Sequence, residues 1–134
     1  MPLYWTIDSK ERLFTAVAEG QVTVDDAMAL LDAMTGSGAV AYAKLLDGRA
    51  VTTAMSGDDL LSVCARIRAL HENHRVGPLA VIGTPEQTVV YSRLLGALAS
   101  ADRPIKLFET PRRAHNWLRE RMRCDAELRR AEQS

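Results

Sequence analysis

The stretch that decides the fold is PLAVIGTPEQ, residues 78–87. Its first half, Leu79–Ile82, is a continuous apolar run of the kind found in a central strand that is covered on both faces. Its second half places an N-cap residue at Thr84, a proline at the first helical position and Gln87 three residues after the cap, which together favour a helix start. A buried strand followed at once by a helix is typical of an α/β fold.

The same strand-then-helix pattern occurs on both sides of this stretch. Upstream, Ala43–Asp47 reads as a strand, residues 48–55 as a polar loop, and Ser56 as the cap of a helix with an acidic first turn. Downstream, Ile105–Phe108 reads as the last strand, and Thr110-Pro111 repeats the cap-then-proline signal for a fourth helix. The three apolar runs predict parallel strands that alternate with helices.

The N-terminal part differs, because two strands come before the first helix. Leu3–Asp8 and Arg12–Glu19 are rich in aromatic and β-branched residues and are separated by a loop short enough for a hairpin. Gly20 is expected to end the second strand, and a helix is expected over Val24–Met34. The complete prediction is an α/β domain with a mixed five-stranded sheet, an N-terminal hairpin and about four helices.

Composition and charge narrow the functional class. With 134 residues and 47% hydrophobic content, the chain predicts one domain, residues 1–118, followed by a charged extension at 119–134 that continues the last helix or frays. Residues 112–134 hold seven arginines against four acids, although the whole chain has a formal charge of zero. Such a mixed helix face is typical of a solvated surface, so we expect no nucleic-acid binding.

Other functional classes lack their sequence signals. Cys64 and Cys124 do not have metal-ligand spacing, and His71 and His74 have no third ligand at an evident spacing. No nucleophile–base pair is evident, so we expect a protein that is not an enzyme and has neither metal nor cofactor. No apolar stretch is long enough to span a bilayer, which predicts a soluble, cytoplasmic protein without stable membrane insertion. Arginine outnumbers lysine by 14 to 3, which is typical of a bacterial, GC-rich source.

Candidate site residues lie where the predicted strands end. Ligands of open α/β sheets bind beyond the carboxyl ends of the strands, which selects Asp47, Arg49 and Thr84. Asp47 could bind a ligand or a partner, or only hydrogen-bond the following loop; Arg49 could neutralise an anion or only be exposed. Ser56 could serve purely as a helix cap, or as a phosphosite that gains about −1.5 to −2 charges.

The chain resembles the STAS domain superfamily, named for sulfate transporters and anti-sigma-factor antagonists, and in particular its SpoIIAA-like branch. The resemblance covers roughly residues 3–118. The residues that carry it are Tyr4–Asp8, Leu13–Gly20, Tyr42–Asp47 with Arg49, Pro78–Ile82 with the capped helix after it, Ile105–Phe108 and Ala114–Leu118. STAS domains are regulatory binding modules, and in the antagonists a serine at the start of the helix after the third strand is phosphorylated. Ser56 occupies a comparable place.

The sequence therefore predicts a non-enzymatic STAS-like module that binds a protein partner through the edge between strand three and helix two. The alternative is a carrier or sensor of a small amphipathic or anionic ligand, held in a pocket between helices and sheet, since the SpoIIAA-like branch also resembles lipid-carrying Sec14-type domains. The arginine-rich last helix and the exposed edge strands favour a homodimer.

Overall fold

One mixed sheet organises the chain. The computed structural model describes residues 3–53, 56–73, 76–87, 92 and 105–133. The elements are β1 (Leu3–Asp8), β2 (Leu13–Gln21), α1 (Val24–Gly36), β3 (Ala43–Thr53), α2 (Gly57–Asn73), β4 (Leu79–Ile82), β5 (Ile105–Phe108) and α4 (Pro111–Gln133). The sheet has the strand order β1-β2-β3-β4-β5, with β1 antiparallel to β2 and every later pair parallel. The predicted α/β class, mixed five-stranded sheet and N-terminal hairpin are confirmed.

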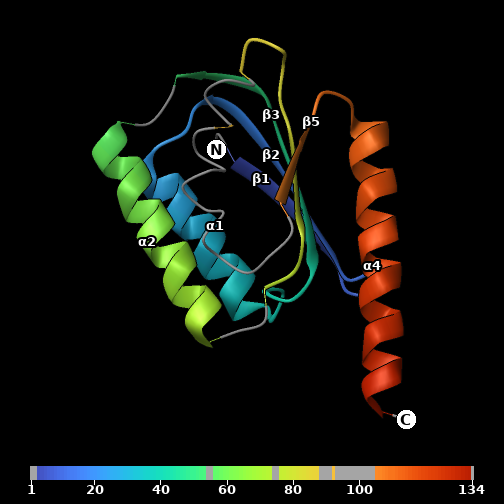
Figure 1. Ribbon diagram of the computed structural model, residues 1–134. Helices are drawn as coiled ribbons and strands as arrows, with labels where there is room; N and C mark the ends of the chain where they lie inside the picture. Colours follow the sequence, from blue (N-terminus) through green and yellow to red (C-terminus); the bar gives the residue numbers. More distant parts are fainter. Residues whose placement is uncertain (1–2, 54–55, 74–75, 88–91, 93–104, 134) are drawn as a thin grey trace.

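Helices cover both faces of this sheet. Helices α1 and α2 lie side by side on one face, and α4 is the described helix that runs along the other (Figure 1). The described residues thus contain three helices. A further helix is predicted to start at Thr84. Of this segment the described residues include only the first turn, through Gln87, and position 92, and the remainder lies outside them. None of the described helices combines the length and the apolar character needed to cross a membrane.

Helices α1, α2 and α4 each begin at a capping residue, and the caps of α2 and α4 are those predicted from the sequence. At α1, the Asp26 backbone N–H donates to Thr23 Oγ1 at 3.2 Å, and the Thr23 N–H donates to the Asp26 carboxylate at 2.9 Å, which forms a capping box. At the start of α2, Ser56 Oγ accepts a hydrogen bond from the Asp59 N–H at 3.2 Å. At the start of α4, Thr110 Oγ1 accepts one from the Arg113 N–H at 3.4 Å. Each helix therefore begins where its cap predicts.

Two strands end later than the sequence predicts. Gly20 does not end β2, which continues to Gln21 with Gly20 at φ +64°, and β3 does not stop at Asp47 but continues to Thr53. β4 ends at Ile82, opposite Asp47, so among the described strands the later part of β3 pairs with β2 alone. Small and polar residues suit that half-covered ribbon, and this is why residues 48–53 resemble a loop in the sequence.

Two hydrophobic cores lie on the two faces of the sheet. The core under α1 and α2 contains Phe14, Leu31 and Met34, with Trp5 packed against it. The core under α4 contains Leu45, Ala80, Ile82, Ala114 and Leu118, with Trp117 and Met122 packed against it. Both tryptophans thus pack against the cores.

Candidate functional site

The centre of the predicted site is an ion pair between Asp47 and Arg49. Asp47 lies on β3 opposite Ile82, next to the carboxyl end of β4. Arg49 Nη2 lies 2.7 Å from Asp47 Oδ2, while Arg49 Nε donates to Oδ1 at 3.0 Å and the Arg49 backbone N–H donates to the same oxygen at 3.2 Å. This two-pronged contact holds the arginine along the strand that carries its partner.

The pair alters the electrostatics of both groups. Hydrogen bonding from the Arg49 guanidinium holds the pKa of the Asp47 carboxyl below its ordinary value, and partial burial opposes this effect. Asp47 is therefore ionised at neutral pH, and its negative charge compensates that of Arg49. An anionic ligand would have to compete with Asp47 for this guanidinium, so the geometry favours the structural role of the pair that the sequence left open.

A turn after β4 lies beside this pair. The Thr84 N–H donates to Gln87 Oε1 at 2.9 Å, and the Gln87 N–H donates to Thr84 Oγ1 at 3.3 Å. Gln87 Nε2 also reaches the carbonyl oxygens of Arg49 and Val51 at 3.5 and 3.3 Å. Gln87 thus serves the predicted helix start and also ties it to the extended part of β3.

Ser56 lies apart from these residues. It is exposed immediately before α2, beyond the end of β3, and its described hydrogen bond is the cap to Asp59. Leu61, in the second turn of α2, leaves 64% of its surface exposed, and Asp58 and Ser62 are exposed next to it. The structure therefore divides the predicted site into an edge containing Asp47, Arg49 and Thr84, and a separate surface at the start of α2.

The sequence did not predict the contact of Gln87 with β3 or the exposure of Leu61, for different reasons. Gln87 was recognised as a capping residue, but its contact with β3 depends on a strand extension that polar residues concealed. Leu61 follows directly after another leucine in an amphipathic segment, so composition alone could not separate an exposed leucine from a core one. Only the rotation of α2 against α1 and the sheet distinguishes them.

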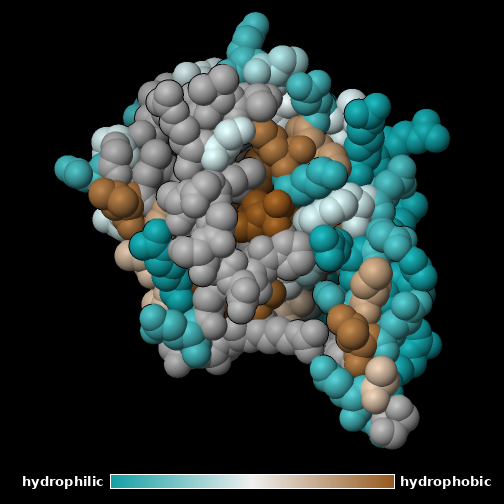
Figure 2. Space-filling view, viewed as in Figure 1, coloured by the Kyte–Doolittle hydropathy of each residue, from teal (hydrophilic) through white to brown (hydrophobic). Residues whose placement is uncertain are grey.

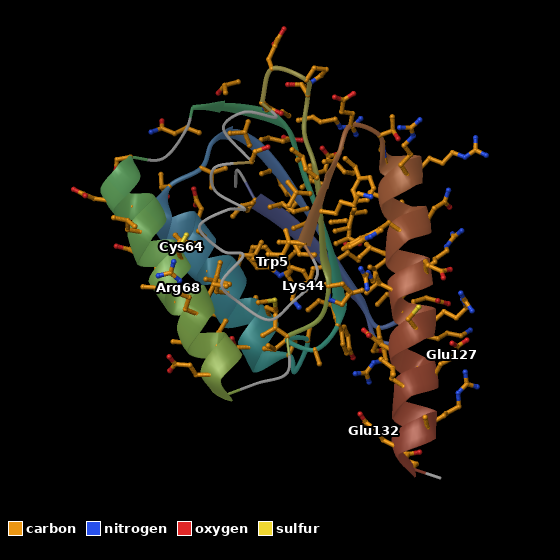
Figure 3. All side chains as sticks on the ribbon, viewed as in Figure 1. Trp5, Lys44, Cys64, Arg68, Glu127 and Glu132 are labelled. Atoms are coloured by element: carbon orange, nitrogen blue, oxygen red, sulfur yellow. The ribbon has the colours of Figure 1, made fainter. Side chains whose placement is uncertain are left out.

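A buried lysine on β3 was also missed as a special position. Lys44 is only 5% exposed, and its Nζ donates to the carbonyl oxygens of Val40 and Tyr42 at 2.5 and 2.8 Å. Figure 3 shows Lys44 and Trp5 in the layer between the sheet and helices α1 and α2. These bonds satisfy carbonyl groups of the loop before β3, so the ammonium group stabilises that loop from inside.

A pocket lies at the amino ends of the strands, opposite the end that carries Asp47 and Arg49. It has a volume of about 250 Å³ and lies where β2, β3 and β4 begin, between the β1–β2 turn and α4. Its lining includes Lys10, Arg12, Pro78, Met122 and Asp125. It is a mixed-charge pocket at the amino ends of the strands, whereas the sequence directed attention to their carboxyl ends.

The described residues contain no group of three or more histidine, cysteine or acidic side chains that could hold a metal ion. The His71 side chain and His74 lie outside the described part of the structure. Cys64 is buried and Cys124 half-buried on different helices, and both are free thiols. Burial raises the pKa of the Cys64 thiol, which makes that thiol a poor nucleophile at neutral pH.

Comparison with known proteins supports the fold. No protein-family model matches the chain, and a search of curated proteins found no match. Among solved structures, an uncharacterized DUF3478-family protein from Shewanella loihica PV-4, described as having a SpoIIAA-like fold, matches with a TM-score of 0.64 at 18% identity, covering 87% of this chain and 93% of the other. An anti-sigma factor antagonist from Mycobacterium paratuberculosis matches with a TM-score of 0.56 at 19% identity, covering 87% and 94%.

These similarities establish the fold class. The chain has the SpoIIAA-like, STAS-type α/β fold, and the fold expected from the resemblance is confirmed. Each match spans almost the whole of the related chain. One structure of this fold comes from an anti-sigma factor antagonist, but a fold at this level of identity does not specify a partner.

Proposed function

We propose that this protein is a non-enzymatic binding module that recognises a protein partner through the start of α2. The observation that carries the proposal is Leu61, a large apolar side chain left 64% exposed about one turn from the exposed Ser56 cap. Apolar side chains at the centre of an interface, surrounded by polar groups, contribute much of the binding energy. Asp58 and Ser62 would supply that polar surround.

In this proposal Ser56 is also the regulatory position. A phosphate there would add about −1.5 to −2 charges at a helix N-terminus, where backbone N–H groups favour an anion, but next to Asp58 and Asp59, which repel it. The added charge would change the surface next to Leu61 without entering a core. The likeness of the fold to that of an anti-sigma factor antagonist supports this mode of action.

The test is quantitative affinity capture of a partner from the native host with matched variants. Leu61→Ala is expected to weaken capture at least about tenfold, the effect of a residue that contributes roughly 1.4 kcal/mol. Tyr4→Ala is the control, since Tyr4 is another large side chain of comparable exposure, 51%, on strand β1. Equal capture by wild type and Leu61→Ala, or equal loss with both variants, would contradict the proposed surface.

A carrier role is the second candidate, and the pocket beside α4 is the observation that favours it. Its volume of about 250 Å³ would admit a small molecule, and Lys10 and Arg12 could bind an anionic group. Comparing native and denatured masses of protein purified from its own host separates the two functions. A mass lost on denaturation supports the carrier, whereas a mass increase of one phosphate mapped to Ser56 supports the regulated module.

A further inference from the structure

The second half of α4 lies outside both hydrophobic cores, although Asp125 still lines the pocket beside the β1–β2 turn. Every α4 residue in the core or packed against it lies between Ala114 and Met122, and among the described side chains none from Arg123 onward joins either core. Figure 1 shows this half of α4 continuing beyond the ends of the strands. A solvated helix this short is only marginally stable alone, so a partner surface for it would add stability.

A row of residues along this helix has the spacing of a helix–helix contact. Trp117, Arg121, Cys124, Leu128 and Ala131 follow one another at intervals of four and three residues, which places them on one side of the helix. Leu128 is 58% exposed. Figure 2 shows a narrow hydrophobic strip along the lower half of α4, bordered by hydrophilic atoms.

The upper end of the row is already covered within the domain. The Trp117 ring packs against Phe108 with 5.7 Å between ring centroids, and the Arg121 guanidinium lies 5.6 Å from the centre of the Trp117 ring. The part of the row that is open to a partner therefore lies C-terminal to Arg121, on the segment that continues beyond the ends of the strands. A partner would have to lie along that segment and to the side of α4.

The charges on this segment suit a second copy of the same helix. Residues 119–133 carry five arginines and four acids, so a partner of one strong charge would meet repulsion as well as attraction. Arg123 pairs with Glu120 and Glu127 on its own helix, with 3.1 Å between Arg123 Nη1 and Glu127 Oε1. Arg121, with its stacking contact to Trp117, is the charged residue within the row.

We propose that two copies of this protein associate through antiparallel pairing of their α4 helices, with the two-fold axis between Cys124 and Leu128. In this arrangement Cys124 of each copy faces Leu128 of the other. Arg121 faces Ala131 of the second helix, next to Glu127 and Glu132. Parallel pairing would instead place the two Arg121 side chains against each other, which charge repulsion disfavours.

The geometry also fixes the expected strength. The paired segments are about 22 Å long at 1.5 Å per residue, so the contact is smaller than a standard protein interface. The proposal therefore predicts a reversible monomer–dimer equilibrium that depends on protein concentration.

Analytical ultracentrifugation of the full chain tests this proposal over about a hundredfold range of concentration. The expected result is a shift from 14.8 kDa toward twice that mass, and Leu128→Asp is expected to abolish it. Leu61→Asp, an equally drastic change at an exposed leucine outside α4, is expected to leave the dimer unchanged. Circular dichroism melting shows whether each variant is folded.

Charge exchange and crosslinking give independent readouts. Arg121→Glu is expected to weaken dimerisation, and adding Glu132→Arg to the same chain is expected to restore it. A short bis-maleimide is expected to link two chains through Cys124, because Cys64 is buried. A chain that stays monomeric throughout the concentration range, or a dimer that persists in Leu128→Asp, would overturn the proposal. Neither result bears on the Leu61 surface, so the two proposals fail separately.

Discussion

Replacing Gly77 by alanine tests a close backbone contact between Gly77 and the loop before β3. A Cβ atom at Gly77 would lie 2.2 Å from the Tyr42 carbonyl oxygen and 2.6 Å from that of Ala41, whereas ordinary contacts are 3.4–4 Å. Both obstacles are main-chain atoms. They belong to the loop before β3, whose Tyr42 carbonyl also accepts a hydrogen bond from the buried Lys44 ammonium. Because moving the loop would disturb this bond, we expect its displacement to cost free energy.

The cost follows from the hydrogen bonds that must open. Two backbone hydrogen bonds are strained if the backbone at Gly77 moves away from this loop. In one, the Gly77 N–H donates to the Val40 carbonyl oxygen at 3.1 Å, and in the other, the Lys44 N–H donates to the Pro78 carbonyl oxygen at 2.8 Å. Each such bond contributes about 1 kcal/mol, and overpacking adds about 1–3 kcal/mol. We therefore expect Gly77→Ala to lower the free energy of unfolding by roughly 3–5 kcal/mol.

Urea unfolding followed by tryptophan fluorescence measures this change, because Trp5 and Trp117 report on opposite faces of the sheet. Gly36→Ala is the matched control, since a Cβ there meets nothing within 4 Å, and alanine should stabilise the end of α1 by up to about 1 kcal/mol. A Gly77→Ala variant within about 1 kcal/mol of wild type would refute the argument, because it would show that the loop adjusts freely.

Three further outcomes are expected. Ser56→Ala should lower the free energy of unfolding by about 0.5–2 kcal/mol, whereas Ser56→Asp should change it little because aspartate also caps; chemical denaturation compares the two variants. Because the pKa of Asp47 is lowered in the folded state, its stabilising contribution is present above about pH 4 and lost as the pH falls through the folded pKa. The stability difference between wild type and Asp47→Asn, at most about 1 kcal/mol for so exposed a pair, should therefore shrink in acid, and a difference that grew on acidification would contradict this. Maleimide labelling of the native protein followed by mass spectrometry should modify Cys124 well before Cys64, and equal rates would show that Cys64 is accessible.

The order of elements and the helix starts could be predicted because their signals are local. The caps at Ser56, Thr84 and Thr110 each satisfy backbone N–H groups within three residues, so residue type and spacing suffice to find them. The apolar run at Leu79–Ile82 marks a central strand because both faces of the sheet are covered there. These local signals were enough to define the fold class.

The remaining features depend on contacts between distant segments. The extension of β3 to Thr53 exists because β2 continues beside it, and neither segment alone has the pattern of a strand. The side-chain contact of Gln87 with the Val51 carbonyl joins residues 36 positions apart. The exposure of Leu61 depends on how α2 packs against α1 and the sheet, which helical periodicity does not specify. Asp47 and Arg49 are candidate site residues because they follow an apolar run, but only the structure shows that they pair with each other.

The strand order has a consequence for how the chain is made. Each strand pairs with the strand that comes immediately before it in the sequence, so no pairing has to wait for a segment synthesised much later. A nascent chain can close the β1–β2 hairpin first and then add β3, β4 and β5 as each leaves the ribosome. Contacts close in sequence favour rapid folding. The growing edge of the sheet would stay exposed only until the next strand is made, which shortens the time during which it could pair with another chain.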